Sequence, residues 1–205
     1  MEPLKKHWEA VYKTKDSTDV SWYQPRLEKS LEFISVTGVP RNSSIIDVGG
    51  GASTLVDDLL AEKYEHITVL DLSSEALMRA KGRLGERAQE VTWIEADITE
   101  VSFPPDSFDL WHDRAVFHFL TRQEEKKRYI KTLTNSLKSG GYLVMATFSL
   151  EGPLKCSGLE VVRYSPETLS REFGEEFILL KSSLECHQTP FDTVQNFSYS
   201  LFKCR

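Results

Sequence analysis

Short apolar runs alternate with helical patterns along the middle of this chain, and this alternation limits the folds available to it. The runs lie at residues 44–48, 66–71, 91–96, 108–111 and 142–148. Apolar side chains recur at helical spacing after the first run, after the second run and before the fifth. Strands and helices in this order form parallel sheets with right-handed crossovers. The pattern therefore predicts an α/β fold with a doubly wound, mostly parallel sheet.

The two ends of the chain depart from the alternation. Two strand-like runs at about 176–187 and 195–204 flank the short sequence "QTPFDTV", and a connection this short joins antiparallel strands. Before Ser43, apolar side chains recur at helical spacing. We expect one domain over residues 1–205, with an antiparallel hairpin at its end and a helical cover or lid over residues 1–40.

Charge, hydropathy and cysteine usage exclude several classes of protein. Acidic residues outnumber basic ones by 31 to 25, and the net charge of −6 disfavours nucleic acid and anionic membranes as partners. No apolar run approaches the roughly 20 residues that cross a bilayer, and the first residues lack the apolar stretch of a secretion signal. Three scattered cysteines without CxxC spacing disfavour a disulfide framework and a zinc site. We expect a cytoplasmic protein without a metal.

The sequence "IIDVGGGAS" at residues 45–53 indicates a ligand at the end of the first strand. Gly49, Gly50 and Gly51 occupy the first strand-to-helix turn, where a doubly wound sheet comes closest to its ligand. A dinucleotide fingerprint that starts at Gly49 needs a further glycine where Thr54 stands, and the Gly-Lys-Ser/Thr ending of a P-loop is absent. Both phosphate-binding interpretations are therefore weakened.

Acidic residues mark the ends of the first three strands. Asp47, which precedes the glycines, suits an ammonium group better than a pyrophosphate. Asp71 ends the second strand, where an acid can accept hydrogen bonds from the two hydroxyls of a ribose. Asp97 follows the third strand and can accept from the exocyclic amine of adenine, with Ile98 beside it as an apolar face.

These residues carry a resemblance to a known family. The sequences "DVGGGAS", "VLDLS" and "IEADI", in this order, resemble motifs I, II and III of class I S-adenosylmethionine-dependent methyltransferases. The resemblance covers about residues 43–148, and the terminal hairpin matches the reversed last strand of that fold. One departure is Ser53, where many members carry a third glycine of the motif, and it puts in doubt only how tightly the helix starts.

The resemblance implies S-adenosylmethionine (SAM) as cofactor, S-adenosylhomocysteine as its product, and a Rossmann-like sheet of seven strands in the order 3-2-1-4-5-7-6. In this fold the N-terminal segment commonly folds over the methionine end of SAM, which makes Trp22 and Tyr23 candidates to face the sulfonium. The alternative is that they only pack within a helical cap. The implied cofactor contacts are Trp22, Tyr23, Asp47, Gly49, Gly50, Gly51, Asp71, Leu72, Asp97, Ile98 and His112.

The sequence "LWHDRAVFHF" at residues 110–119 lies at the end of the fourth strand, where this family keeps its reacting groups. His112, Asp113 and His118 are candidates to remove a proton from the acceptor. Structural hydrogen bonding is the alternative for each, and methyl transfer also proceeds without a base when the acceptor is held in line. We expect Arg114 to pair with Asp113 or a glutamate rather than to hold a substrate.

A long loop at residues 149–164 is expected on the substrate side, because long loops at the ligand end of a sheet are usually functional. Lys155, Arg163 and Tyr164 are candidates to hold a polar or anionic substrate, and a solvated loop is the alternative.

The sequence therefore predicts a SAM-dependent methyltransferase with a small-molecule acceptor. A protein lysine methyltransferase is the first alternative, and a SAM-binding protein without activity is the second. A nicotinamide oxidoreductase is disfavoured by the missing glycine and by the absence of a Tyr-x-x-x-Lys pair at the fourth and fifth strands.

Overall fold

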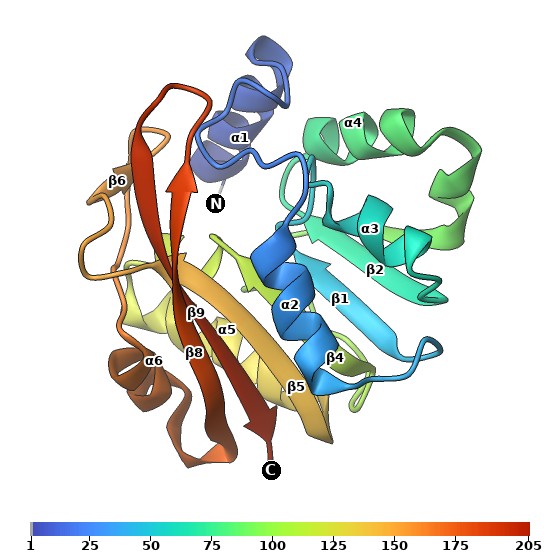
Figure 1. Cartoon of the computed structure of the whole chain (residues 1–205), viewed down its shortest axis with the longest axis vertical. Helices are drawn as coiled ribbons and strands as arrows, with labels where there is room; N and C mark the ends of the chain where they lie inside the picture. Colours follow the sequence, from blue (N-terminus) through green and yellow to red (C-terminus); the bar gives the residue numbers. More distant parts are fainter. Residues whose placement is uncertain (1) are drawn as a thin grey trace.

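A seven-stranded mixed sheet runs through the computed structural model, which describes residues 2–205 (Figure 1). Its order is β3-β2-β1-β4-β5-β9-β8. The strands are β1 Ser44–Val48, β2 His66–Asp71, β3 Val91–Glu95, β4 Phe108–Arg114, β5 Leu137–Phe148, β8 Phe177–Gln188 and β9 Val194–Cys204. The first five are parallel, and β9 is antiparallel to both β5 and β8. Since β8 and β9 are the sixth and seventh strands of this sheet, the predicted order and the antiparallel end are confirmed.

Helices cover both faces of the sheet. They are α1 Glu2–Thr14, α2 Glu28–Thr37, α3 Leu55–Ala61, α4 Ser74–Leu84, α5 Gln123–Ser136 and α6 Pro166–Phe173, with short 3-10 turns η1 Gly85–Glu90, η2 Phe117–Phe119 and η3 Gly174–Glu176. A small separate hairpin joins β6 Lys155–Cys156 and β7 Leu159–Glu160 within the 149–164 loop. Local capping starts two of the helices, because the Ser73 hydroxyl accepts from the N–H of Ala76 and Ser165 precedes Pro166.

Two apolar layers form on the two faces, because side chains alternate along each strand. Ile45 of β1 and Leu110 of β4 lie in the layer that includes α2 and α3. Their neighbours Ile46 and Trp111 lie in the layer that includes α5 and α6. Burial of both faces is typical of a parallel sheet between helices.

The boundary between α5 and β5 differs from what the sequence predicts. The sequence "SGG" at residues 139–141 predicts the end of the helix there, and this prediction is wrong, because α5 ends at Ser136 and β5 begins at Leu137. Leu137 pairs with Phe108 of β4, and the register shifts between this pair and Leu110. A Cβ at Gly141 would lie 2.8 Å from the carbonyl oxygen of Lys138, so the glycine permits a close backbone approach inside the strand.

Two helices also start one residue later than their sequence patterns predict, since these patterns predict Ser53 as the cap of α3 and Thr121 as the cap of α5. Thr54 directly precedes α3, and the Ser53 hydroxyl instead accepts from the N–H of Leu55. Arg122, not Thr121, directly precedes α5, and Glu125 reaches back to the N–H of Arg122.

The N-terminal segment is attached to the C-terminal hairpin, which lies beside it in Figure 1. The ring Nε2 of His187 lies 2.8 Å from the carbonyl oxygen of Ser21, and Nδ1 lies 3.0 Å from the amide nitrogen of Gln24. The Gln195 amide donates to the Ser21 hydroxyl at 3.0 Å. Residues from the two ends of the chain are therefore held together at one edge of the sheet.

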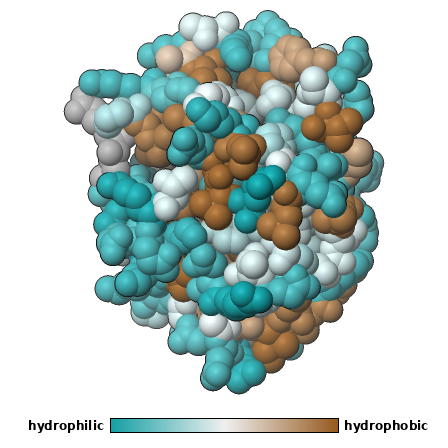
Figure 2. Space-filling model, turned by 90° about the vertical axis from the view of Figure 1, so that its left-hand side faces the viewer, coloured by the Kyte–Doolittle hydropathy of each residue, from teal (hydrophilic) through white to brown (hydrophobic). Residues whose placement is uncertain are grey.

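Figure 2 shows that hydrophobic side chains emerge only in small groups among polar ones on the face at the left of Figure 1. The most exposed large ones in the molecule include Leu154 and Leu184. Single exposed apolar side chains are common on protein surfaces. Within residues 2–205, no helix is long and apolar enough to cross a membrane, and no three metal-ligating side chains come together.

Candidate active site

The carboxyl ends of β3, β2, β1 and β4 meet along one edge of the sheet. Val48, at the end of β1, pairs with Leu70 of β2 and Asp113 of β4, and Asp71 of β2 pairs with Glu95 of β3. The turns that follow these strands therefore lie side by side. Open parallel sheets bind their ligands at this edge.

The glycine turn after β1 packs directly against two acidic side chains. Gly49 has a φ of +70°, a left-handed conformation that favours glycine. A Cβ at Gly50 would overlap the carboxylate of Asp47, and one at Gly51 would overlap the carboxylate of Asp71. The bare backbone thus lets both carboxylates lie next to the turn, and a larger residue would displace them.

The three acids expected at the strand ends have different surroundings. Asp71 is buried, its Oδ1 accepts from the N–H of Ser73 at 2.8 Å, and burial raises its pKa to about 7. Asp47 is also buried, and its Oδ2 has no hydrogen-bond partner among the described residues. Asp97 accepts from the backbone N–H and the hydroxyl of Thr99, each at 2.7 Å. Because a buried oxygen without a partner is costly, Asp47 is suited to accept a hydrogen bond from a ligand.

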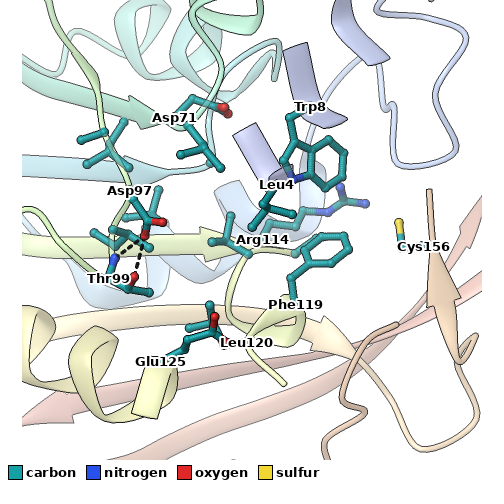
Figure 3. A pocket seen from close by; sticks show the side chains of 18 of the residues that line it. Leu4, Trp8, Asp71, Asp97, Thr99, Arg114, Phe119, Leu120, Glu125 and Cys156 are labelled. Carbon is teal, nitrogen blue, oxygen red and sulfur yellow. Dashed lines mark hydrogen bonds between the residues drawn. The ribbon is translucent and has the colours of Figure 1, made fainter. Parts of the chain in front are cut away.

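A cavity of about 290 Å³, here called the larger cavity, opens over these strand ends. Figure 3 shows Asp71, Asp97 and Thr99 on one side of it and Trp8, Phe119 and Cys156 on the other. The first side, called the acidic end, also includes Leu72 and Ile98. The second side, called the aromatic end, is lined by Trp8, Tyr12, Trp22, Arg114, Phe119, Phe148, Cys156 and Phe197. The cavity thus joins a polar region to an apolar one.

Trp8 is the centre of the aromatic end. Its ring centroid lies 5.2 Å from that of Phe119 and 5.6 Å from that of Trp22, and both pairs are close to perpendicular. Edge-to-face contacts of this kind are favourable between aromatic rings. Trp8 and Tyr12 come from one face of α1, so the first helix and the segment after it form a wall of the cavity.

A smaller cavity of about 40 Å³ adjoins the larger one. Its lining includes Tyr23, Asp47, Gly50 and His112, and both cavities share Tyr12, Trp22, Gly49 and Arg114. All but one of the cofactor contacts predicted from sequence therefore line one cavity or the other. Gly51 is the exception, because it is not among the described lining residues and packs against Asp71.

Comparisons with known proteins identify the family. Residues 46–145 match the model of a family described as "Methyltransferase domain". The N-methyltransferase NodS from Bradyrhizobium japonicum WM9, solved with S-adenosylhomocysteine, has the same fold, with a TM-score of 0.72 at 18% identity over 96% of this chain and 97% of NodS. The chain is a class I SAM-dependent methyltransferase.

Curated relatives of this methyltransferase differ in their acceptors. "EEF1A lysine methyltransferase 2" from Danio rerio is 24% identical over 188 residues, which are 83% of this chain and 80% of the relative. "Malonyl-[acyl-carrier protein] O-methyltransferase" from Paenibacillus sp. (strain JDR-2) is 30% identical over 179 residues, which are 79% of this chain and 63% of the relative. The comparisons thus show the reaction and the SAM cofactor, and they leave the class of acceptor open.

Two of the three ionisable residues predicted as catalytic belong to buried networks in β4. His112 Nδ1 lies 2.7 Å from Asp47 Oδ1, and its Nε2 lies 2.9 Å from the Ser30 hydroxyl. Asp113 accepts from the Tyr129 hydroxyl at 2.6 Å and from the N–H of Val116 at 2.9 Å. Burial raises the pKa of Asp113 to about 6. These contacts give both side chains structural roles in the methyltransferase, and a catalytic role for either stays a prediction.

His118 is fully buried in η2. Its Nδ1 accepts from the N–H of Phe148 at 3.2 Å, and burial lowers the pKa of the ring to about 3. A base with so low a pKa removes protons poorly near neutral pH. His118 and Asp113 are not among the described residues that line the two cavities, and His112 lines only the smaller one. This geometry does not support proton removal by these three residues.

The 149–164 loop contributes Cys156 to the lining of the larger cavity, and not the three residues that were expected to bind the substrate. Arg163 donates to the carbonyl oxygen of Leu150 at 2.6 Å and so holds the loop together. Tyr164 is 2% exposed and belongs to the apolar layer with α5 and α6, and Lys155 is exposed. In the described lining of either cavity, the loop is represented by Cys156 and by none of these three. Substrate binding by Lys155, Arg163 and Tyr164 therefore stays a prediction without support from the geometry.

Sequence reasoning missed several residues of the aromatic end. Trp8 and Tyr12 had a signal, because they share a helical face in a segment expected to cover the sheet. Phe197 and Phe148 had none, because they come from strands whose apolar residues are equally suited to the core. Arg114 was expected to pair with Asp113 or a glutamate, and the structure places it beside Glu185.

Proposed function

We propose that this methyltransferase transfers the methyl group of SAM to a compact small molecule with an apolar part. The aromatic end of the larger cavity carries this proposal. Its six aromatic side chains, Trp8, Tyr12, Trp22, Phe119, Phe148 and Phe197, surround a limited space. The volume of about 290 Å³ is near the lower limit for ligand pockets, and the cofactor itself fills part of it.

We infer that the acidic end holds the adenosine of the cofactor. The Asp71 carboxylate would accept from the ribose hydroxyls, Asp97 would accept from the adenine amine, and Ile98 would contact the face of the base. Asp47, whose Oδ2 has no partner among the described residues, would accept from the ammonium group of the methionyl end. When bound, the cofactor supplies a methyl group on a positively charged sulfur.

The aromatic end orients the acceptor and excludes water. Aromatic faces beside a sulfonium stabilise the cation by about 0.5–2 kcal/mol. Exclusion of water strengthens electrostatic interactions and prevents side reactions. Since the predicted bases do not line the larger cavity, we attribute the acceleration mainly to holding the acceptor in line with the methyl group.

Lysine in a protein is the second candidate acceptor, because curated relatives include a lysine methyltransferase of eEF1A. The charges at the aromatic end argue against it. Among the described lining residues, the carboxylates of Asp71, Asp97 and Glu125 lie away from Phe119 and Cys156 in Figure 3, whereas the cation Arg114 lies close to them. A cation disfavours a lysine ammonium at this position.

The test is a methyl-transfer screen with SAM that carries a radioactive methyl group. One arm offers small aromatic alcohols, amines, thiols and carboxylic acids, and the other offers lysine peptides and purified elongation factor. We expect labelling in the first arm and its loss in the Asp71→Ala variant. Labelling confined to the protein arm, and lost in the same variant, would establish a lysine methyltransferase instead.

A further inference from the structure

Arg114 is the last residue of β4, and its guanidinium lies where the two cavities meet. We propose that Arg114 anchors a carboxylate group of a bound ligand. The inference rests on the proposed function, since it assumes that SAM and the acceptor share these cavities. It assigns a binding role to a residue that was not among the predicted cofactor or substrate contacts.

Three contacts hold the guanidinium in place. Its Nε donates to the Tyr199 hydroxyl at 3.1 Å, and Nη1 donates to the carbonyl oxygen of Trp22 at 3.0 Å. The guanidinium also lies over the ring of Phe197, 4.4 Å from the centroid. With 6% of the side chain exposed, Arg114 has little freedom to turn. Its donors therefore keep fixed directions.

Part of this buried cation lacks a partner. An arginine has five N–H donors, and two of them are engaged here. Nη2 is buried without a hydrogen-bond partner in the described part of the chain. Oε2 of Glu185 lies 4.0 Å from Nη2, too far for a hydrogen bond, and is itself unpartnered in the same sense. Because unpaired buried donors are costly, the site is suited to a ligand that accepts hydrogen bonds.

The choice of a carboxylate follows from the geometry of the donors. A guanidinium presents parallel N–H groups that match the two oxygens of a carboxylate. Glu185 offsets part of the positive charge. A ligand carboxylate must therefore compete with the Glu185 carboxylate, whose Oε2 lies 4.0 Å from Nη2. In the larger cavity, the ring that lies against the guanidinium is that of Phe197, which has no acceptor atom.

A chain of hydrogen bonds behind Arg114 makes Tyr199 a positioning residue. The Tyr199 hydroxyl lies 3.2 Å from that of Ser30, and Ser30 in turn contacts His112, which contacts Asp47. All donors can point in one direction, from the Arg114 Nε–H to the Asp47 carboxylate. The network therefore holds the cation and the Asp47 carboxylate at fixed places, and both residues line the smaller cavity.

Two ligands can supply the carboxylate. One is the methionyl end of the cofactor, whose ammonium group would bind Asp47, which also lines the smaller cavity. The other is the acceptor, in the aromatic end of the larger cavity. The chemistry at Arg114 is the same in both cases, and the experiment separates them.

The first arm compares S-adenosylhomocysteine with 5′-methylthioadenosine, which lacks the amino-acid end, by calorimetry. If the cofactor supplies the carboxylate, Arg114→Gln lowers the affinity for S-adenosylhomocysteine at least about tenfold, as expected for loss of charge-assisted hydrogen bonds, and leaves that for 5′-methylthioadenosine unchanged. Arg114→Lys, which keeps the charge beside Glu185, and Tyr199→Phe give smaller losses with the same selectivity. Arg171→Gln, at an exposed arginine of α6, is the matched control and changes neither affinity.

The second arm titrates the protein, saturated with S-adenosylhomocysteine, with benzoate and with benzyl alcohol. If the acceptor supplies the carboxylate, benzoate binds more tightly than the alcohol, and Arg114→Lys and Arg114→Gln remove that preference without changing either affinity in the first arm. The proposal is overturned if neither arm depends on Arg114, or if 5′-methylthioadenosine loses as much affinity as S-adenosylhomocysteine. Labelling of lysine alone in the methyl-transfer screen would overturn the proposed small-molecule acceptor. The calorimetric comparison of S-adenosylhomocysteine with 5′-methylthioadenosine would still test the role of Arg114.

Discussion

Ionisation of Asp71 has two opposite effects. It destabilises the free protein, and it strengthens the ligand binding that we propose for this residue. Burial raises its pKa to about 7, so the folded protein takes up a proton that the unfolded chain, with an ordinary carboxyl pKa near 3.8, has already lost. The free protein is therefore destabilised as the pH rises through this window and the buried carboxyl ionises. Ribose hydroxyls that donate to Asp71 favour the ionised form, which couples ligand affinity to pH.

We predict that the affinity for S-adenosylhomocysteine rises with pH up to about 7 and is then constant. With a pKa of about 7, the ionised fraction of Asp71 is about tenfold smaller at pH 6 than at pH 8, and the affinity should differ by about that factor. Calorimetric titrations between pH 5.5 and 8.5 measure the profile.

The Asp71→Asn variant is the control for this profile, because asparagine cannot ionise. It should bind S-adenosylhomocysteine more weakly at pH 8, without the rise below pH 7, and it should melt at a higher temperature than the natural protein at pH 8. An unchanged pH profile in this variant would assign the titration to another group.

At the scale of the elements, local signals predicted more of the structure than signals that depend on distant contacts. Ser73 and Ser165 cap their helices by accepting from backbone N–H groups three residues along. The sequence predicts Ser165 as a cap, and it predicts a cap at Ser73 or Ser74, of which the structure selects Ser73. The start of β5 at Leu137 was not predicted, because an apolar residue at the end of a helical pattern is compatible with either the helix or a strand. Its pairing with Phe108, 29 positions away, decides the outcome.

The same division applies to the site. Asp47, Asp71 and Asp97 could be predicted because parallel strands bring their carboxyl ends to one edge. The proposed anchor at Arg114 could not, because its partners Trp22, Glu185 and Tyr199 come from the two ends of the chain. Only the folded chain brings these residues together.

The attachment of the N-terminal segment to the β8–β9 hairpin gives a prediction at this scale. His187→Ala removes the contacts of the ring with Ser21 and Gln24. We expect faster amide hydrogen exchange over residues 16–26, because that segment loses contacts that hold it on the cavity. We also expect a few-fold faster dissociation of S-adenosylhomocysteine in stopped-flow fluorescence.

Phe191→Ala is the comparison for His187→Ala, since Phe191 lies at the tip of the same hairpin with 56% of its surface exposed. This variant should leave exchange over residues 16–26 and ligand dissociation unchanged. Equal effects of the two substitutions would show that the hairpin as a whole, and not the His187 contacts, holds the segment.

At the scale of the whole molecule, the larger cavity joins parts of the chain that are far apart in sequence. Its lining includes Trp8 of α1, Asp71 of β2, Phe119 of η2 and Phe197 of β9. A ligand that touches all of them binds only the folded arrangement. Ligand binding should therefore stabilise the molecule as a unit and not only the glycine turn.

We predict that S-adenosylhomocysteine at a hundredfold excess over its Kd adds about 2.7 kcal/mol to the free energy of unfolding. For a chain of this length, each kcal/mol raises the Tm by about 2–4 °C, so calorimetric scans should show a rise of about 5–10 °C. NAD at the same concentration should give no rise, because the glycine turn lacks the third glycine of a dinucleotide site. The Asp71→Ala variant should lose most of the effect of S-adenosylhomocysteine, since Asp71 connects the acidic end of the cavity to the ligand. A rise of equal size with NAD would instead mean that the cavity recognises any adenine nucleoside, and that the methionyl end contributes little to binding.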